Sequence, residues 1–340
     1  MYVRRWTAGL AAVLVLAAGG CALGTGDDQR LAEEVAAKQY PGRLKVVTAR
    51  NLFPETSGSE VVFALTGDPG TVVRLRVDAE AGTCRRESCE RQLAEAVRAG
   101  ESLGAAWRHL ATAFQGCGHP VIATNWPLNE VWIEAAPTNA TVKAVLAEVG
   151  ECVQRWAADR DGSSDAEKSG SLSVNLIEPA VARKRPQGAP EYPAMLRLTD
   201  SELRAALSEK SRFIASYTVA EDESKPPAVT MRIFRPFDER QAFEKKVQEA
   251  VAGWLRANRP GATVGGVVGI WYLEPGTVDR LAGHVRFCEG KPQGGQCRGE
   301  EVVAVAVDPQ GNPVGGFEVM QDEKGAPQLP DGPGGDRGTG

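Results

Sequence analysis

The chain is poor in histidine and has no long apolar run, and each shortage excludes a class of protein. Three of its 340 residues are histidine, His109, His119 and His284, and none stands at metal-ligand or nucleophile–base spacing. The H-E-x-x-H, G-x-S-x-G, P-loop and dinucleotide-binding glycine patterns are all missing. The longest apolar run, Ala8 to Ala18, is shorter than the roughly 20 residues with which a helix crosses a bilayer. We therefore expect no metal, no cofactor, no enzyme of these families and a body that lies outside the membrane.

The composition is that of a globular protein with a small acidic surplus. Hydrophobic residues make up 42% and charged residues 24% of the chain, which excludes a wholly disordered or fibrous protein. The formal charge of −5 argues against nucleic acid, and against anionic lipid headgroups, as main partners.

The cysteines indicate an oxidising compartment. Apart from Cys21 there are six, an even number that favours disulfides in an exported chain: Cys84, Cys89, Cys117, Cys152, Cys288 and Cys297. Six cysteines allow fifteen pairings, and the sequence cannot choose among them. Proximity along the chain suggests Cys84–Cys89, Cys117–Cys152 and Cys288–Cys297. The alternative, a metal site, needs clustered ligands such as two C-x-x-C pairs, which these spacings do not provide.

The N-terminus has the order of an export signal. Arg4 and Arg5 precede the apolar run, and the small pair Gly19-Gly20 leads to Cys21. This arrangement resembles the lipobox of bacterial lipoproteins, which implies cleavage before Cys21 and fatty acyl chains, palmitate among them, on its thiol. Lipidation would tether the protein to the outer face of the cell membrane. The alternative is an ordinary cleaved signal that leaves a spare thiol.

Patterning along the chain predicts an α+β protein with two domains, each with helices packed on an antiparallel sheet. We expect a signal peptide at 1–20, a tether at 21–28, a first domain at 29–160, a linker at 161–190, a second domain at 191–324 and a disordered tail at 325–340. Asp27 or Asp28 is expected to cap the first helix, and Thr138 or Asn139 a later one. Strands are expected at 44–49, 61–66, 72–77, 131–133, 229–234, 264–273, 281–288, 302–307 and 314–319.

The same order of elements occurs twice. A helix, a Pro-Gly stop and an antiparallel meander are expected at 29–78 and again at 238–320, through duplication or through independent use of a common layout. A helix laid across a curved antiparallel sheet resembles the cystatin-like and PepSY-like layouts of exported bacterial proteins. As a whole, the anchor and the Ala/Arg/Gly/Val bias resemble uncharacterised actinobacterial lipoproteins.

Aromatic residues supply the candidate binding surface. Trp126 stands in an Asn-Trp-Pro-Leu segment that we expect to be an exposed loop, while Trp271 and Tyr272 alternate across a strand, so that one of them should face outward. These features favour a non-enzymatic binding or assembly module at the cell envelope, with an unknown envelope protein, peptide or glycan as its partner. The alternatives are an envelope hydrolase with dispersed catalytic residues, for which His119 is the candidate base, and a small-molecule receptor.

Overall fold

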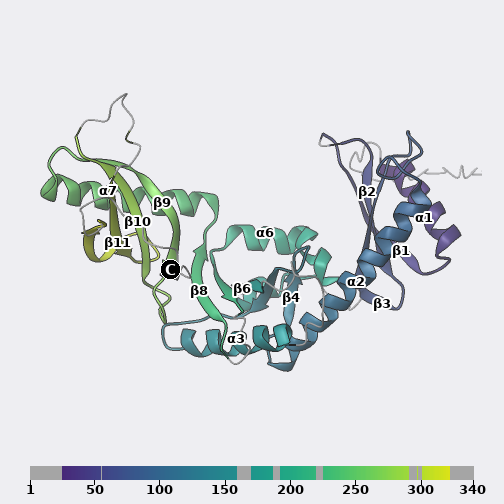
Figure 1. The fold of residues 1–340 in the computed structure, drawn as a ribbon, viewed down its shortest axis with the longest axis horizontal. Coiled ribbons are helices and arrows are strands. Elements are labelled where there is room, and N and C mark those ends of the chain that lie inside the picture. Colours follow the sequence, from purple (N-terminus) through teal and green to yellow (C-terminus); the bar gives the residue numbers. More distant parts are fainter. Residues whose placement is uncertain are drawn as a thin grey trace, which may run out of the picture. The chain divides into compact units, whose positions relative to one another are not determined.

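The computed structural model describes residues 25–54, 56–158, 170–186, 192–219, 225–290, 297 and 301–321. The fold is α+β, and the described strands form one three-stranded and one nine-stranded sheet. The chain divides into two compact units (Figure 1). The smaller unit contains residues 1–67 and 73–100, and the larger contains residues 68–72 and 101–340. Cys21 and the expected tail at 325–340 lie outside the described residues.

The smaller unit packs helices against an antiparallel sheet. Its elements are α1 (Thr25–Gln39), β1 (Leu44–Asn51), β2 (Ser59–Leu65), the second half of β3 (Asp68–Val77) and the first turns of α2 (Cys89–Gly116). The strand order is β1-β2-β3, with β1 and β2 antiparallel. Alternate residues of the strands, such as Phe63 and Leu75, pack against Ala32 and Val35 of α1 and Leu93 of α2 in one apolar cluster.

The nine-stranded sheet is the centre of the larger unit. In chain order its strands are β4 (Val121–Thr124), β5 (Glu130–Glu134), β6 (Ser171–Ile177), β7 (Arg212–Thr218), β8 (Ala228–Phe234), β9 (Thr263–Leu273), β10 (Leu281–Cys288), β11 (Glu301–Val307) and β12 (Pro313–Val319). Each lies beside the next in the sheet. Strands β5 and β6 are parallel, because the helix α3 (Val142–Ala158) connects them as a crossover, and the other neighbouring strands pair antiparallel.

Helices cover both faces of this sheet. On one face α3 and α7 (Phe237–Asn258) bury Val149 and Val251 against the strands in the largest apolar cluster, and Figure 1 shows α7 lying along β9 to β11. On the other face lie the short helices α5 (Pro179–Ala182), η1 (Ala194–Thr199) and α6 (Ser201–Glu209), where Leu203 packs against Trp132 and Ile177. Among the described residues, none of the helices is both long and apolar enough for a membrane span.

Part of the segment that was expected to be a linker, 161–190, is instead a strand of the nine-stranded sheet. Residues 171–177 form β6, which pairs with β5 on one side and β7 on the other. Strand β5 was expected in the first domain, but it belongs with β4 to the same sheet as the later strands, and the division between units falls near residue 100. Strand β6 is hard to recognise from the sequence, because the polar residues Ser171, Ser173 and Asn175 alternate with its apolar side chains.

Two expected helix caps are also placed differently. Because α1 begins at Thr25, Asp28 lies inside its first turn, and its carboxylate accepts hydrogen bonds from Ser59 and from the backbone of Ala79. The side chain of Asn139 reaches the turn between β9 and β10, where it accepts a hydrogen bond from the Val278 amide at 2.8 Å. Both residues therefore connect their helix to the sheet instead of closing its first turn.

Candidate functional site

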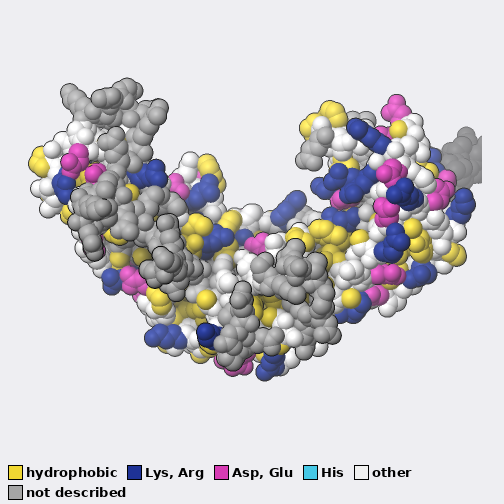
Figure 2. All heavy atoms as spheres, in the orientation of Figure 1, with side chains coloured by type: hydrophobic (Ala, Val, Ile, Leu, Met, Phe, Trp, Pro, Cys, Tyr) yellow, Lys and Arg dark blue, Asp and Glu magenta, His cyan; other side chains and the backbone are white. Residues whose placement is uncertain are grey.

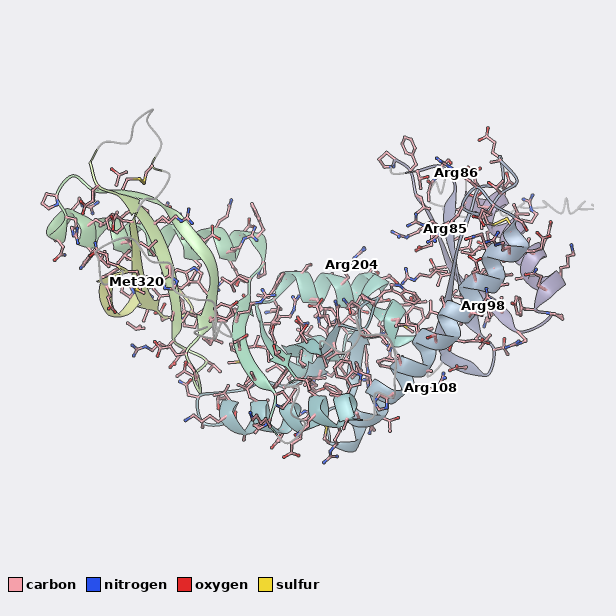
Figure 3. The ribbon with its side chains drawn as sticks, viewed as in Figure 1. Arg85, Arg86, Arg98, Arg108, Arg204 and Met320 are labelled. Carbon is pink, nitrogen blue, oxygen red and sulfur yellow. A yellow bond between two sulfur atoms is a disulfide. The ribbon has the colours of Figure 1, made fainter. Side chains whose placement is uncertain are left out.

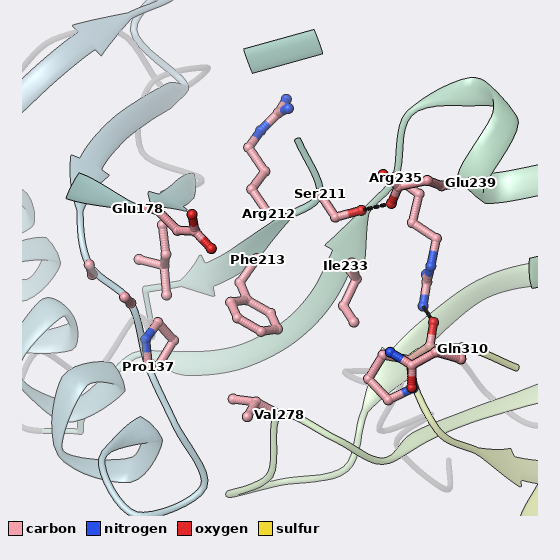
Figure 4. Close-up of a pocket in the computed structure, with 14 residues that line it drawn as sticks. Pro137, Glu178, Ser211, Arg212, Phe213, Ile233, Arg235, Glu239, Val278 and Gln310 are labelled. Carbon is pink, nitrogen blue, oxygen red and sulfur yellow. Dashed lines mark hydrogen bonds between the residues drawn. The ribbon is translucent and has the colours of Figure 1, made fainter. Parts of the chain in front are cut away.

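A pocket of about 310 Å³ opens at one end of the nine-stranded sheet (Figure 4). We call it the sheet-end pocket. The end of β6, the start of β7, the end of β8 and three turns converge on it. It is lined by Ala135, Ala136, Pro137, Leu176, Glu178, Ser211, Arg212, Phe213, Ile233, Arg235, Glu239, Val278, Pro309 and Gln310. All of these residues belong to the larger unit.

The floor of the sheet-end pocket is an apolar row across three strands. Leu176 of β6 pairs with Phe213 of β7, and Phe213 pairs with Ile233 of β8. Directly paired residues project from the same face of a sheet, so the three side chains form one continuous apolar surface. Pro137 and Val278 extend this surface from two neighbouring loops. The floor can therefore hold an apolar portion of a ligand.

Carboxylates stand at the rim of the pocket. Glu178 directly follows β6, and Figure 4 shows its carboxylate directed toward the space beside Phe213. Glu239, in the first turn of α7, accepts a hydrogen bond of 2.6 Å from the Ser211 hydroxyl. A carboxylate beside an apolar floor favours a hydrogen-bond donor or a cation on the part of a ligand that faces it.

Arg235 joins the rim to the turn between β11 and β12. Its guanidinium donates to the Pro309 carbonyl at 3.0 Å and lies 3.9 Å above the ring of Phe243. Burial lowers the pKa of Arg235, although Glu239 acts in the opposite direction. Because the guanidinium is already held by a carbonyl and a ring, it serves to fix the wall of the pocket.

Arg212 occupies the other face of the sheet. Figure 4 shows its side chain turned away from Phe213, as the alternation of β7 requires. Its Nε donates to the Oδ1 of Asn175 at 2.8 Å, and the Nδ2 of Asn175 donates to the Oε1 of Glu130 at 2.9 Å. Burial lowers the pKa of Arg212, and the Glu130 carboxylate opposes that effect. This polar chain holds β5, β6 and β7 together behind the pocket floor.

The aromatic residues that the sequence nominated do not line the pocket. Trp126 is 40% exposed, in the turn between β4 and β5. Trp271 is buried and meets Phe243 edge-on with 5.3 Å between ring centroids, in space left by Gly283, where a Cβ would collide with the indole. Tyr272 is half-buried on the opposite face of β9. The candidate surface is therefore reduced to Trp126 and Tyr272, which lie on different elements.

The six cysteines outside the N-terminus form three disulfides, Cys84–Cys89, Cys117–Cys152 and Cys288–Cys297, which are the pairs that proximity suggested. Disulfides of this kind are typical of proteins that fold in an oxidising compartment. Cys117–Cys152 ties the end of α2 to α3, and Cys288–Cys297 starts from the last residue of β10. Among the described residues, no group of three or more histidine, cysteine or acidic side chains is placed to hold a metal ion.

The three histidines lie on different segments of the fold. The Nε2 of His109 lies 2.9 Å from the Trp156 carbonyl, and the Nε2 of His119 lies 3.4 Å from a carboxylate oxygen of Glu148. His284 is half-buried in β10, and burial lowers its pKa. None of the three lines the sheet-end pocket.

Sequence reasoning missed the sheet-end pocket because its residues come from seven segments spread between positions 135 and 310. One local signal was present: the run Arg212-Phe213-Ile214-Ala215-Ser216-Tyr217 alternates in the way expected of a strand. Comparison with protein-family models, with curated proteins and with solved structures found no match.

Proposed function

We propose that this protein is an exported, lipid-anchored binding module of the cell envelope whose sheet-end pocket takes a small ligand or a ligand side chain. Export and anchoring are supported by the charged, apolar and small-residue order that ends at Cys21, together with the three disulfides. The remaining element of the proposal is the ligand site.

The observation that carries the proposal is a carboxylate that has no ion pair among the described residues and stands beside an apolar floor. Glu178 is exposed and stands next to the row formed by Leu176, Phe213 and Ile233. The two arginines of the lining are turned away or held by a carbonyl, as described above. A ligand with an apolar body and an ammonium or other donor group matches these features.

The experiment uses phenethylamine as a probe, with phenylacetate as its anionic counterpart. The chain from Ala22 to Gly340, folded with its disulfides, is titrated with each compound in a calorimeter. We expect phenethylamine to bind the more tightly, and the Glu178→Gln variant to lose about tenfold of that affinity, the size of a modest charge-assisted hydrogen bond at an exposed site. The matched control is Glu244→Gln on α7, outside the lining, which should bind like the wild type.

Equal affinity for the two probes, or an unchanged affinity in Glu178→Gln, would contradict the assignment of Glu178. If Phe213→Asp, which places a charge on the floor, also leaves binding unchanged, the sheet-end pocket is not the site of binding.

A further inference from the structure

Five neighbouring strands of the larger unit, β6 to β10, contain no aspartate or glutamate. Arginine supplies all of their permanent charge, at Arg212, Arg232 and Arg286. Figure 2 shows a different distribution over the smaller unit, where acidic and basic atoms are intermixed. A run of strands with charge of one sign favours a partner of the opposite sign.

The three arginines project from the same face of the sheet. Met231 and Phe287 belong to the apolar cluster beneath α3 and α7, so the side chains of Arg232 and Arg286, which are their neighbours in β8 and β10, point to the opposite face. Arg212 lies on that face too, turned away from the floor of the sheet-end pocket (Figure 4). We call the surface that bears these three side chains the arginine face.

Arg232 has no partner for its charge among the described residues. Its neighbours across the strands are Ile214 of β7 and Tyr272 of β9, and its side chain is half-buried. Its guanidinium forms no hydrogen bond, ion pair or ring contact in the part of the chain that the structure describes. A cation that is partly removed from water without an acceptor costs free energy, so a ligand that supplies the acceptor gains affinity there.

Arg212, the diagonal neighbour of Arg232, is already engaged. Its Nε donates to the Oδ1 of Asn175 at 2.8 Å, its Nη1 donates to a carbonyl of α6 at 3.0 Å, and its guanidinium carbon lies 3.8 Å from the centre of the Phe234 ring. Burial lowers the pKa of Arg212, Glu130 opposes that effect, and the charge of Arg232 adds to the lowering. The two arginines therefore repel each other across the strands.

The carboxylates around this pair leave one positive charge in excess. Glu130 offsets one of the two arginines. Glu209, at the end of α6, is followed by Lys210, so that end of the helix adds no net charge. The acidic run 221–223 lies outside the described residues, and Arg232 is about 13 Å along β8 from the first residue of the strand. A ligand with a single negative charge would complete the balance.

Tyr272 and Ile270 add an aromatic and an apolar surface beside Arg232. Tyr272 is half-buried, and its hydroxyl forms no hydrogen bond with the described residues. The register of β9 against β10 shifts between Tyr272 and Val268, and Ile270, which lies in this irregular stretch, is 53% exposed. The body of a ligand held by Arg232 can therefore rest on these two side chains.

We infer that Arg232 binds the carboxylate of a small anionic ligand whose aromatic or apolar part lies against Tyr272 and Ile270. A carboxylate matches the planar guanidinium, which donates two parallel hydrogen bonds to such a group. The Tyr272 hydroxyl is a further donor next to it. The site is separate from the sheet-end pocket, which opens on the opposite face, so the protein would have two sites for small ligands of opposite charge.

The test uses benzoate as the probe and its neutral amide, benzamide, as the matched control compound. The chain from Ala22 to Gly340, folded with its disulfides, is titrated with each compound in a calorimeter. We expect benzoate to bind, and benzamide to bind about tenfold more weakly, because charge-assisted hydrogen bonds are roughly twice as strong as neutral ones. Added salt should weaken the binding of benzoate.

Variants test the two side chains separately. Arg232→Gln should weaken benzoate binding about tenfold or more, and Arg232→Lys, which keeps the charge but loses the planar fork, should have an intermediate affinity. Tyr272→Phe removes only the hydroxyl and should weaken binding about threefold to tenfold. The matched control is Arg98→Gln, which removes an exposed cation from α2 in the smaller unit (Figure 3) and should bind like the wild type. Circular dichroism establishes that each variant is folded.

Three results would overturn the site: no binding of benzoate, equal affinity for benzoate and benzamide, or unchanged affinity in Arg232→Gln. Inorganic phosphate that binds as tightly as benzoate would overturn the choice of a carboxylate. Phenylacetate also carries a carboxylate, and we expect Arg232→Gln to lose its binding, whereas binding that is retained would place the anion elsewhere and contradict the inference. Phenethylamine reports on the sheet-end pocket, so either proposal can fail without the other.

Discussion

At the scale of single residues, the larger unit contains a buried polar side chain that no sequence pattern marks as buried. Asn175 is fully buried in β6 and is hydrogen-bonded to Glu130 on one side and Arg212 on the other. Loss of one partner would leave a buried donor or acceptor unmatched, which costs about 1–3 kcal/mol. The pairing could not be foreseen, because the three residues belong to three strands and no local pattern connects positions 130, 175 and 212.

His284 gives a pH prediction at the same scale. Burial lowers its pKa below the ordinary value of 6.5, so the unfolded chain takes up a proton at His284 more readily than the folded chain does. The folded state therefore loses stability as the pH falls through about 6.5 toward the lower folded-state pKa, and this loss is absent at higher pH.

We expect His284→Gln to flatten the fall in unfolding free energy between about pH 7 and pH 5. Urea unfolding followed by tryptophan fluorescence across this range measures the effect. His109→Gln serves as the comparison. If His284→Gln keeps the full wild-type pH dependence of the unfolding free energy, another group causes the loss of stability at acidic pH.

At the scale of elements, the sequence predicted the later half well and the middle poorly. The strands β8 to β12 and the helix α7 lie within a few residues of the expected positions. In each of them the apolar residues follow one strand or helix spacing over the whole segment. The register of β9 and β10 shifts at Gly265, which forms a bulge between Val264 and Gly266. Strands β4, β6 and β7 and helix α6 were not foreseen. They are short, and β6 alternates serine and asparagine with its apolar residues.

The link between α2 and α3 gives a prediction about elements. The Cys117–Cys152 disulfide closes a loop with a sequence separation of 35, against 5 for Cys84–Cys89. On loop entropy, removal of the first should cost about 3–4 kcal/mol and removal of the second about 2 kcal/mol. Paired cysteine-to-alanine variants, compared by urea unfolding, measure the two losses. An equal or reversed order would mean that packing around the sulfurs, and not loop closure, sets their contribution.

At the scale of the whole molecule, the net charge conceals how the charges are distributed. The acidic total argued against contact with anionic lipid, and even the loop that exposes Arg85 and Arg86 also contains Asp78, Glu80 and Glu87. A total charge adds groups that lie far apart, whereas binding at a membrane depends on those within about one Debye length of the surface. The order of residues alone cannot supply this distinction, because the fold decides which charged side chains come to lie within that distance of one another.

The proposed anchor at Cys21 gives the last prediction, and it concerns the intact chain in the cell that exports it. Two acyl chains hold a protein at a membrane far more firmly than one, since each buried CH₂ adds about 0.8 kcal/mol. We expect the mature protein to begin at Cys21, to carry the mass of a diacylglyceryl group there and to enter the detergent phase on phase separation. Cys21→Ala should lose both the added mass and the detergent partition. Cys84→Ala/Cys89→Ala, which removes a disulfide and leaves Cys21 in place, should keep them. Recovery of the unmodified chain with residues 1–20 attached and its cysteines reduced would contradict export and anchoring together, while a chain cut before Cys21 with a free thiol would contradict the lipid alone.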